Sequence, residues 1–258
     1  MTDHTVDELV VLKLGGSVIT DKDSPETVDD AALDSVLDTV AASLTNRHTE
    51  FRLIVVHGGG SFGHVHAAEH GVSTTEGTHE AAAANAIHSA MKRLNDEVVD
   101  RLQHRDVAAL PVHPLSAAAR DSDGVLSLSA TAVDGLLAAG FVPVVHGDVI
   151  AHAGEGVTVL SGDEIVTSLA ESLGASRVGL CSTVRGVLDA DDTVIETIRS
   201  FEDVAPVLGG SASTDVSGGM AAKVQELLDL GAPAHIFGPD AVEDFLNGKQ
   251  AGTLVDGV

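Results

Sequence analysis

The chain has 258 residues, of which 44% are hydrophobic, and 39 acidic against 14 basic residues give it a formal net charge of −25. The apolar content excludes a disordered chain, and the negative charge argues against nucleic acid or anionic membranes as partners, because such a surface repels them. No apolar run reaches the roughly 18 residues of a membrane span, and the acidic first ten residues lack the features of a secretory signal. The single cysteine, Cys181, allows no internal disulfide. We therefore expect a cytoplasmic protein.

Lysine is rare in this acidic chain, and most of it lies next to glycine. Three of the five lysines, Lys13, Lys22 and Lys223, lie in or beside glycine-rich segments, whereas Lys92 and Lys249 are typical of a surface. Ammonium groups beside exposed backbone amides are a common arrangement for binding phosphate. The acidic residues are scattered along the whole chain, which is typical of proteins from a high-salt cytoplasm. We therefore also expect a halophilic source.

Short apolar runs alternate with amphipathic helical patterns, which is typical of a parallel α/β sheet. The predicted strands cover 9–14, 53–56, 107–112, 126–128, 141–145, 157–160, 177–181, 234–237 and 252–255. The predicted helices cover 28–44, 87–102 and 131–139, and two more end near 173 and 230. Ligands of such sheets bind at the carboxyl ends of the strands, so the segments that follow the strands are the candidates for a site.

The stretch HGGGSFGH at 57–64 directly follows a predicted buried strand. Three consecutive glycines weaken strands and helices, but they let the backbone approach a ligand and offer N–H groups to an anion. The histidines at its two ends, His57 and His64, would add ring donors at the same place. A tight turn with two surface histidines is the alternative interpretation of this stretch taken alone.

Other strand ends carry further groups that suit phosphate. Lys13 interrupts the apolar run 9–14 and precedes a Gly-Gly-Ser turn at 15–17, so we expect it to reach a phosphate whose other oxygens meet the amides of that turn. A lysine that reaches solvent from an edge strand is the alternative. Two later strands end in Gly-Asp, at Asp148 and Asp163, which could hold lysines, hydroxyls or Mg²⁺ at one edge of the sheet.

A metal site is conceivable at His66 and His70, which are four residues apart and could share one face of a helix. No carboxylate or cysteine completes a convincing ligand set with them in the sequence. We therefore expect no resident metal site.

Five motifs in this order resemble the amino acid kinase superfamily: KLGGSVITDK (13–22), HGGGSFGH (57–64), HGDV (146–149), SGDE (161–164) and DVSGGMAAK (215–223). The resemblance implies a three-layer αβα sandwich with a mainly parallel open sheet. It implies one domain, 1–258, with an acceptor-binding lobe at about 1–160 and a nucleotide-binding lobe at about 161–258. Within the superfamily, the SFGH and ITDK segments are similar to isopentenyl phosphate kinases, which make isopentenyl diphosphate from isopentenyl phosphate and ATP in an archaeal branch of the mevalonate pathway.

The resemblance also implies roles for individual residues. Catalytic roles fall to Lys13, Lys22, His64 and Asp163, with His64 as a hydrogen-bond donor to the acceptor phosphate and Asp163 as the acid that orients the lysines. The acceptor is implied to bind at Gly58, Gly63, His64 and Gly162, and the ATP phosphates at Lys13, Gly15, Gly16, Ser17, Gly59, Gly219 and Lys223. Mg²⁺ is implied to accompany ATP, without protein ligands that the motifs identify. A homodimer is implied in the same way.

One segment departs from the family pattern, because many relatives carry T-D-V-D-G-V where this chain reads STVRGV at 182–187. Contacts to the base and ribose are therefore not implied. Two alternatives stay open, namely a kinase of the same fold for UMP, a fosfomycin-type antibiotic or an amino acid, and a non-catalytic nucleotide-binding regulator. His64 favours a phosphate or phosphonate acceptor, and the small apolar stretch 81–90 suits the border of a short hydrocarbon tail.

Overall fold

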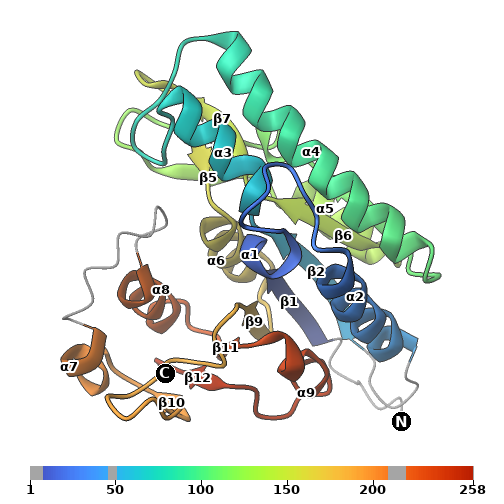
Figure 1. Ribbon diagram of the computed structural model, residues 1–258, viewed down its shortest axis with the longest axis vertical. Coiled ribbons are helices and arrows are strands. Elements are labelled where there is room, and N and C mark those ends of the chain that lie inside the picture. Colours follow the sequence, from blue (N-terminus) through green and yellow to red (C-terminus); the bar gives the residue numbers. More distant parts are fainter. Residues whose placement is uncertain (1–7, 46–50, 209–218, 258) are drawn as a thin grey trace.

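The computed structural model of the protein describes residues 8–45, 51–208 and 219–257. Within these residues the central element is a sheet of eight strands in the order β10-β12-β11-β9-β1-β2-β6-β3 (Figure 1). Neighbouring strands are parallel except for β11 and β12. The strands are β1 (Glu8–Leu14), β2 (Phe51–His57), β3 (Ala109–Val112), β6 (Val142–His146), β9 (Arg177–Cys181), β10 (Thr197–Ile198), β11 (Ala234–Phe237) and β12 (Thr253–Val255).

A second, smaller sheet corrects part of the predicted topology. It contains β4 (Ala118–Arg120), β5 (Leu126–Leu128), β7 (Asp148–His152) and β8 (Gly156–Leu160), in the order β5-β4-β7-β8. The predicted strands 126–128 and 157–160 therefore exist, but they do not belong to the main sheet. Strand β7 was not predicted, because it follows β6 after Gly147 alone and begins with a charged residue that sequence patterns assign to a loop.

The helices are α1 (Gly16–Ile19), α2 (Asp30–Thr45), α3 (Gly60–His70), α4 (Ala81–Gln103), α5 (Thr131–Ala138), α6 (Gly162–Leu173), α7 (Ala205–Leu208), α8 (Gly219–Leu228) and α9 (Val242–Leu246). Helix α4 begins at Ala81 rather than at the predicted Ile87, because its first turns are rich in alanine, the strongest helix former. The short α1 replaces a predicted turn. In the described part of the chain, no helix combines the length and the apolarity that crossing a bilayer requires.

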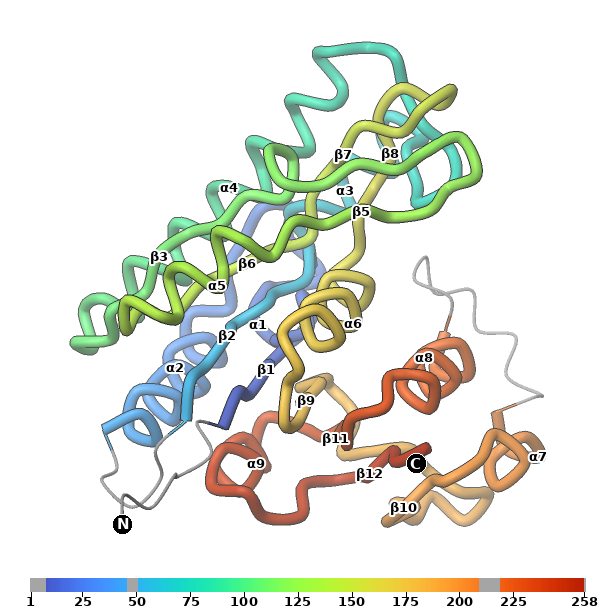
Figure 2. The backbone as a smooth tube through the Cα atoms, turned by 180° about the vertical axis from the view of Figure 1, so that it is seen from behind, coloured from blue at the N-terminus to red at the C-terminus, as the bar shows by residue number. Residues whose placement is uncertain are grey.

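Helices cover both faces of the main sheet and bury two apolar cores. On one face, Val10 and Leu12 of β1 pack with residues of α1, α2, α4 and α9. Leu9 and Val11 face the other side and pack with α5, α6 and α8, and the reverse view shows α5 and α6 in front of the sheet (Figure 2). Successive residues of a strand point to opposite faces, which explains why β1 is apolar nearly throughout. The predicted α/β class and its three-layer αβα sandwich are confirmed.

Strands β2 and β6 end in the fully buried His57 and His146, whose rings stack with centroids 5.7 Å apart. Burial lowers the pKa of His57 to about 4 and also lowers the pKa of His146, so both rings are neutral. Each Nδ1–H then donates to the backbone carbonyl of the following residue. For His57 this is Gly58, at 3.1 Å, and for His146 it is Gly147, at 2.8 Å. These two bonds hold the residues that leave both strands.

The second ring nitrogen of each histidine is also occupied. His113 Nδ1 donates to Nε2 of His146 at 2.8 Å. Nε2 of His57 lies 3.1 Å from Oδ1 of Asn95 on α4, and the amide nitrogen of Asn95 is buried with no hydrogen-bond partner among the described residues. Because a neutral ring that donates from Nδ1 needs a donor at Nε2, we assign the Asn95 amide in the flipped orientation, with its nitrogen toward His57.

Asp148, at the start of β7, is also part of this buried polar layer. Its carboxylate accepts from His88 Nδ1 at 2.8 Å and from the backbone amide of Leu115 at 3.2 Å. Burial raises the pKa of Asp148 against the opposing effect of His88. The sequence interpretation that Asp148 and Asp163 could hold lysines, hydroxyls or Mg²⁺ at one edge is therefore wrong for Asp148, whose side-chain partner is His88 of α4.

The buried neutral His57 predicts a loss of stability in acid. Its pKa is about 4 in the fold and near 6.5 in the unfolded chain, so its contribution is complete above pH 6.5 and disappears as the pH falls toward 4. The free energy of unfolding should fall by about 3 kcal/mol over this window because of His57 alone. Denaturant unfolding in molar KCl measures it, and His57→Asn should flatten the pH dependence, whereas the exposed His104→Ala should not. Parallel pH curves for all three proteins would contradict the assignment.

Candidate functional site

Two glycine turns meet backbone to backbone at the carboxyl edge of the main sheet. They follow the adjacent parallel strands β1 and β2, in which Leu14 lies opposite His57. A Cβ atom at Gly16 would lie 2.1 Å from the amide nitrogen of Gly60, and one at Gly58 would lie 2.8 Å from that of Gly16. Gly60 also has a φ of +46°, in the left-handed region that favours glycine. Side chains would therefore push the two turns apart.

Thr20 joins the two turns through its hydroxyl group. Thr20 Oγ1 donates to the Gly16 carbonyl at 2.8 Å and accepts from the Ser61 amide at 3.0 Å. The amide of Gly58 also donates to the carbonyl of Leu14 at 3.0 Å. The ITDK segment contains Thr20, but its sequence neighbours do not indicate this contact, since Ser61 is far away along the chain.

Helices α1 and α3 begin at these two turns, with Gly16 and Gly60 as their first residues. The first amides of a helix have no acceptor within the helix and are suited to bind an anion. The predicted phosphate-binding residues Gly15, Gly16, Gly58 and Gly59 therefore lie in one place. Ser17 lies beside them and is exposed.

A buried cluster of charges lies beside the glycine turns. Lys13 Nζ lies 2.5 Å from Asp163 Oδ1, and Lys223 Nζ lies 3.7 Å from Asp163 Oδ2. These three residues come from β1, α6 and α8, so strands and helices far apart in the sequence assemble the cluster. Although burial opposes ionisation, the two lysines hold the pKa of Asp163 below its ordinary value. Burial lowers the pKa of Lys13 against the attraction of Asp163. The site therefore presents two ammonium groups around one carboxylate.

Gly162 brings the start of α6 against Lys13 and the second glycine turn. A Cβ atom at Gly162 would lie 3.2 Å from Cε of Lys13 and 3.8 Å from Cα of Gly58. A capping box fixes this end of the helix, because the Ser161 hydroxyl accepts from the Glu164 amide and the Glu164 carboxylate accepts from the Ser161 amide. The predicted residues Gly162, Gly58 and Lys13 are thus neighbours.

The structure places His64, Gly63 and Lys22 around the turns but outside the charge cluster. His64 is exposed on α3, one turn after Gly60, and Gly63 packs against Met91 of α4. Lys22 is exposed in the loop between α1 and α2, and it forms no ion pair within the described part of the chain. The interpretation that His57 also offers a donor here is wrong, since both of its ring nitrogens are bonded inside the core.

Glu26 holds the loop that carries Lys22 against α3. Its amide donates to the Ser61 carbonyl at 3.0 Å, and its carboxylate bonds His66 Nε2 at 2.6 Å and Arg93 Nη2 at 2.5 Å. Glu26 has a φ of +49°, which is uncommon for a residue other than glycine. The sequence analysis missed this contact because the three side chains come from three separate segments.

The nucleotide-side motif lies only partly within the described residues. Asp215 and residues 216–218 of DVSGGMAAK fall outside them, whereas Gly219 opens α8 with a φ of +73° and Lys223 follows one turn later. A cavity of about 50 Å³ lies between β1, β9 and α8. Its lining residues are Lys13, Gly15, Leu180, Cys181, Ser182, Met220, Lys223 and Ile236. Lys13 and Lys223 thus face a common space with the first glycine turn.

A larger cavity of about 980 Å³ lies elsewhere, between α6 and the strands β4 and β5. Its lining includes Glu164 and Glu171 and none of the residues with predicted roles. Glu164 is paired with Arg120, and no lysine of the described residues lines this cavity. Lys13 and Lys223 line only the smaller of the two cavities.

Comparisons with known proteins agree with this geometry. Residues 8–237 match the model of the amino acid kinase family. The chain is 63% identical over 249 residues to the isopentenyl phosphate kinase of Haloferax volcanii, covering 96% of this chain and 99% of the relative. It is 31% identical to the isopentenyl phosphate kinase of Methanocaldococcus jannaschii, with 96% and 98% covered.

A solved structure agrees as well. An X-ray structure of an isopentenyl phosphate kinase superimposes with a TM-score of 0.80 at 27% identity, covering 95% of this chain and 98% of that one. The likeness runs nearly from end to end of both chains. The chain therefore belongs to the amino acid kinase family and, within it, to the isopentenyl phosphate kinases.

Proposed function

We propose that the chain transfers the γ-phosphoryl group of ATP to isopentenyl phosphate, which yields isopentenyl diphosphate and ADP. The observation that carries this proposal is the buried Lys13–Asp163–Lys223 cluster beside the two glycine turns. Such an arrangement supplies positive charge and backbone donors at one point, which is what phosphoryl transfer needs from a protein. The 63% identity to the Haloferax enzyme supports the choice of acceptor.

In this reaction an oxygen of the acceptor phosphate attacks the γ-phosphorus of ATP, and the bond from that phosphorus to the β–γ bridging oxygen breaks. The attacking group is already an anion and needs no general base. The barrier lies in bringing two anions together, and Lys13 and Lys223 lower it by neutralising charge. Asp163 is a positioning residue, because its carboxylate attracts both ammonium groups and directs them at one point.

The acceptor phosphate is proposed to bind at Gly58, Gly63, Gly162 and His64, with Lys22 bridging to the transferred group. The amides at the start of α3 and the exposed imidazole of His64 are donors on the same helix. The Glu26 contacts support this role for Lys22, because they fix the loop on which Lys22 lies. The phosphates of ATP are proposed to contact Lys13, Gly15, Gly16, Ser17, Gly59, Gly219 and Lys223.

Mg²⁺ is proposed to enter with ATP and to be held by phosphate oxygens and water. The described residues at the site do not form a carboxylate cage for it, since Asp163 is engaged by two lysines and the candidate metal-binding group of three in the described chain lies on α3 instead. Mg²⁺ commonly keeps most of its water and uses substrate phosphates as ligands. When bound, it would neutralise the charge of the β- and γ-phosphates.

The hydrocarbon tail is proposed to lie along the first turns of α4. Ile87 is buried there with Ala67, Val72 and Val149, in a small apolar cluster between α3, α4 and the second sheet. Methyl groups and short side chains dominate this cluster, which suits a branched chain of a few carbons better than an ammonium or carboxylate group. This composition favours a prenyl phosphate over the amino acid and UMP alternatives.

The remaining expectations are also proposals. The net charge of −25 and the halophilic relative support a halophilic archaeal source and a cytoplasmic location. We keep the homodimer as a proposal, together with the division into an acceptor lobe at about 1–160 and a nucleotide lobe at about 161–258. Figure 1 shows α7, α8 and α9 at the end of the molecule away from β5 and β7, which is consistent with that division.

The function itself is tested by ADP release in molar KCl with Mg-ATP. Isopentenyl phosphate should be turned over, and UMP, fosfomycin, acetylglutamate, glutamate and aspartate should not. Turnover of one of these alternatives in its place would keep the kinase and refute the acceptor. ATP binding without turnover of any of them would instead favour a non-catalytic regulator.

Replacing His64 should separate the two substrates. His64→Ala should lower kcat/KM for isopentenyl phosphate on the order of a hundredfold, because one donor to the acceptor phosphate is lost, and leave ATP affinity nearly unchanged. His64→Gln, which keeps a donor, should restore part of the rate. An equal loss of ATP affinity, measured by calorimetry, would remove His64 from the acceptor site.

Asp163→Asn should lower kcat on the order of a hundredfold, because Lys13 and Lys223 lose the carboxylate that places them. The matched control is Asp244→Asn, which removes the partner of the exposed Lys249 and should leave kcat unchanged. Circular dichroism establishes that both variants are folded. Equal rates for wild type and Asp163→Asn would show that the cluster is not part of the reaction.

A further inference from the structure

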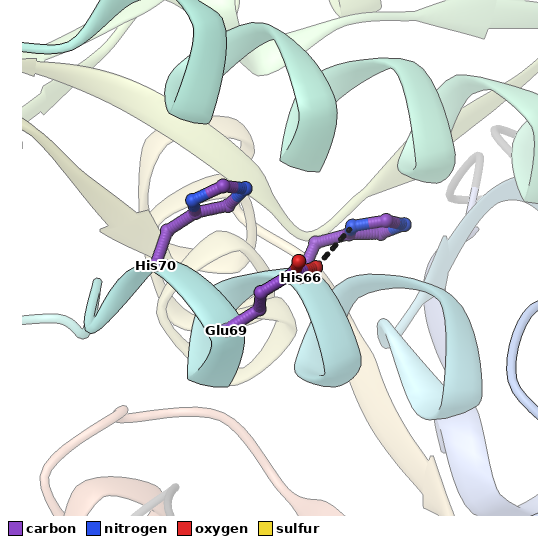
Figure 3. A group of neighbouring side chains, drawn as sticks. All are labelled: His66, Glu69 and His70. Atoms are coloured by element: carbon purple, nitrogen blue, oxygen red, sulfur yellow. Dashed lines mark ion pairs between the residues drawn. The ribbon is translucent and has the colours of Figure 1, made fainter.

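A second cluster of titratable groups lies on α3, apart from the lysines. His66, Glu69 and His70 each offer one ligand atom, and these atoms lie within 4.8 Å of one another (Figure 3). Residues three and four apart share a helix face, which explains why these side chains meet. The sequence alone indicated no carboxylate that completes a ligand set with these two histidines. In the structure Glu69 is that carboxylate.

His66 is held in the orientation that a metal ligand needs. Its Nε2 atom lies 2.6 Å from Oε1 of Glu26, and Arg93 holds the other oxygen of that carboxylate at 2.5 Å. A carboxylate accepts hydrogen bonds, so Nε2 carries a hydrogen, and Nδ1 is the ring atom that can take a metal ion. Metal-ligating histidines usually donate their other N–H to a carboxylate in this way.

Nδ1 of His66 is the ring nitrogen that faces Glu69. This atom is shielded from solvent and has no hydrogen-bond partner within the described protein. Oε2 of Glu69 lies 3.6 Å from it, which is too far for a hydrogen bond. A metal cation between the ring nitrogen and this carboxylate would bind both.

We propose that His66 Nδ1, a ring nitrogen of His70 and the carboxylate of Glu69 bind a divalent transition-metal ion, with Glu26 as the group that orients His66. Two imidazoles favour zinc, cobalt or nickel over Mg²⁺, which prefers oxygen ligands. Glu69 and His70 are exposed, so their side chains can close around the ion by rotation. Three protein ligands leave at least one position for water.

The surface ion-pair network alone does not account for this arrangement. A structural role for the Glu26–His66–Arg93 contacts explains the hydrogen bond at Nε2 and the position of the loop that carries Lys22. It does not involve His70, whose ligand atom lies within 4.8 Å of those of His66 and Glu69. The proposed site shares no residue with the lysine cluster, and it stands whether or not isopentenyl phosphate is the substrate.

Calorimetric titration with CoCl₂ tests the site in protein that has been stripped with a chelator and contains no nucleotide. Molar KCl screens the non-specific attraction of cations to the acidic surface. The wild-type protein should bind one ion per chain tightly enough to measure, with the visible absorption of cobalt bound to nitrogen. His66→Ala and His70→Ala should each weaken binding by at least tenfold, and Glu26→Gln, which leaves all three ligands, should weaken it about tenfold.

The matched control is His104→Ala, which removes an exposed histidine at the end of α4 and should leave binding unchanged. His70 is exposed and lies in the last turn of α3, so His70→Ala keeps the proposal testable even if His66→Ala fails to fold. Absence of saturable binding in the wild-type protein would overturn the proposal. Equal affinity in wild type and His70→Ala would overturn it too, because the bound ion would then lie elsewhere.

Discussion

The contact between the two glycine turns is the constraint on which the site depends. Strands β1 and β2 are parallel neighbours, so their following turns leave the sheet side by side, and Gly16 and Gly60 approach too closely for any Cβ atom. This contact sets the starting points of α1 and α3, and Thr20 closes it with two hydrogen bonds. A phosphate-binding surface made of backbone amides then needs no side chain, because its shape comes from the spacing of two strands.

The charged side chains beside this surface come from the other face of the sheet, on which α6 and α8 pack. Lys13 is buried at the end of β1, where an unpaired ammonium group would cost several kcal/mol. Asp163 compensates it and also attracts Lys223, so one carboxylate sets the position of two cations from separate elements. A buried pair of this kind contributes little net stability. The presence of this pair in an otherwise lysine-poor chain is explained by the chemistry proposed for the site and not by stability.

Helix α3 connects several features that the sequence presents as one motif. Its first turn belongs to the glycine contact, its second turn carries His64, and its later turns carry the proposed metal ligands. Below it, the neutral His57 and His146 hold the strand ends through bonds to Gly58 and Gly147. Neighbouring histidines of the same motif thus serve the core and the surface, and burial alone separates the two roles.

The sequence by itself determined the layered α/β fold, the glycine turns and the place of Lys13 beside one of them, because strand periodicity and glycine spacing are local properties. It did not determine that 157–160 pairs with β7 in a second sheet, since Gly147 alone separates β7 from β6 and the two strands cannot be told apart in the sequence. Nor did it indicate the hydrogen bond between Asp148 and His88 or the one between Glu26 and His66. The burial of the His57 and His146 rings in the core was not indicated either. These depend on pairing between distant segments and on burial, which only the tertiary structure decides. Glu69 meets His66 and His70 for a local reason, because all three lie on the continuous helix α3.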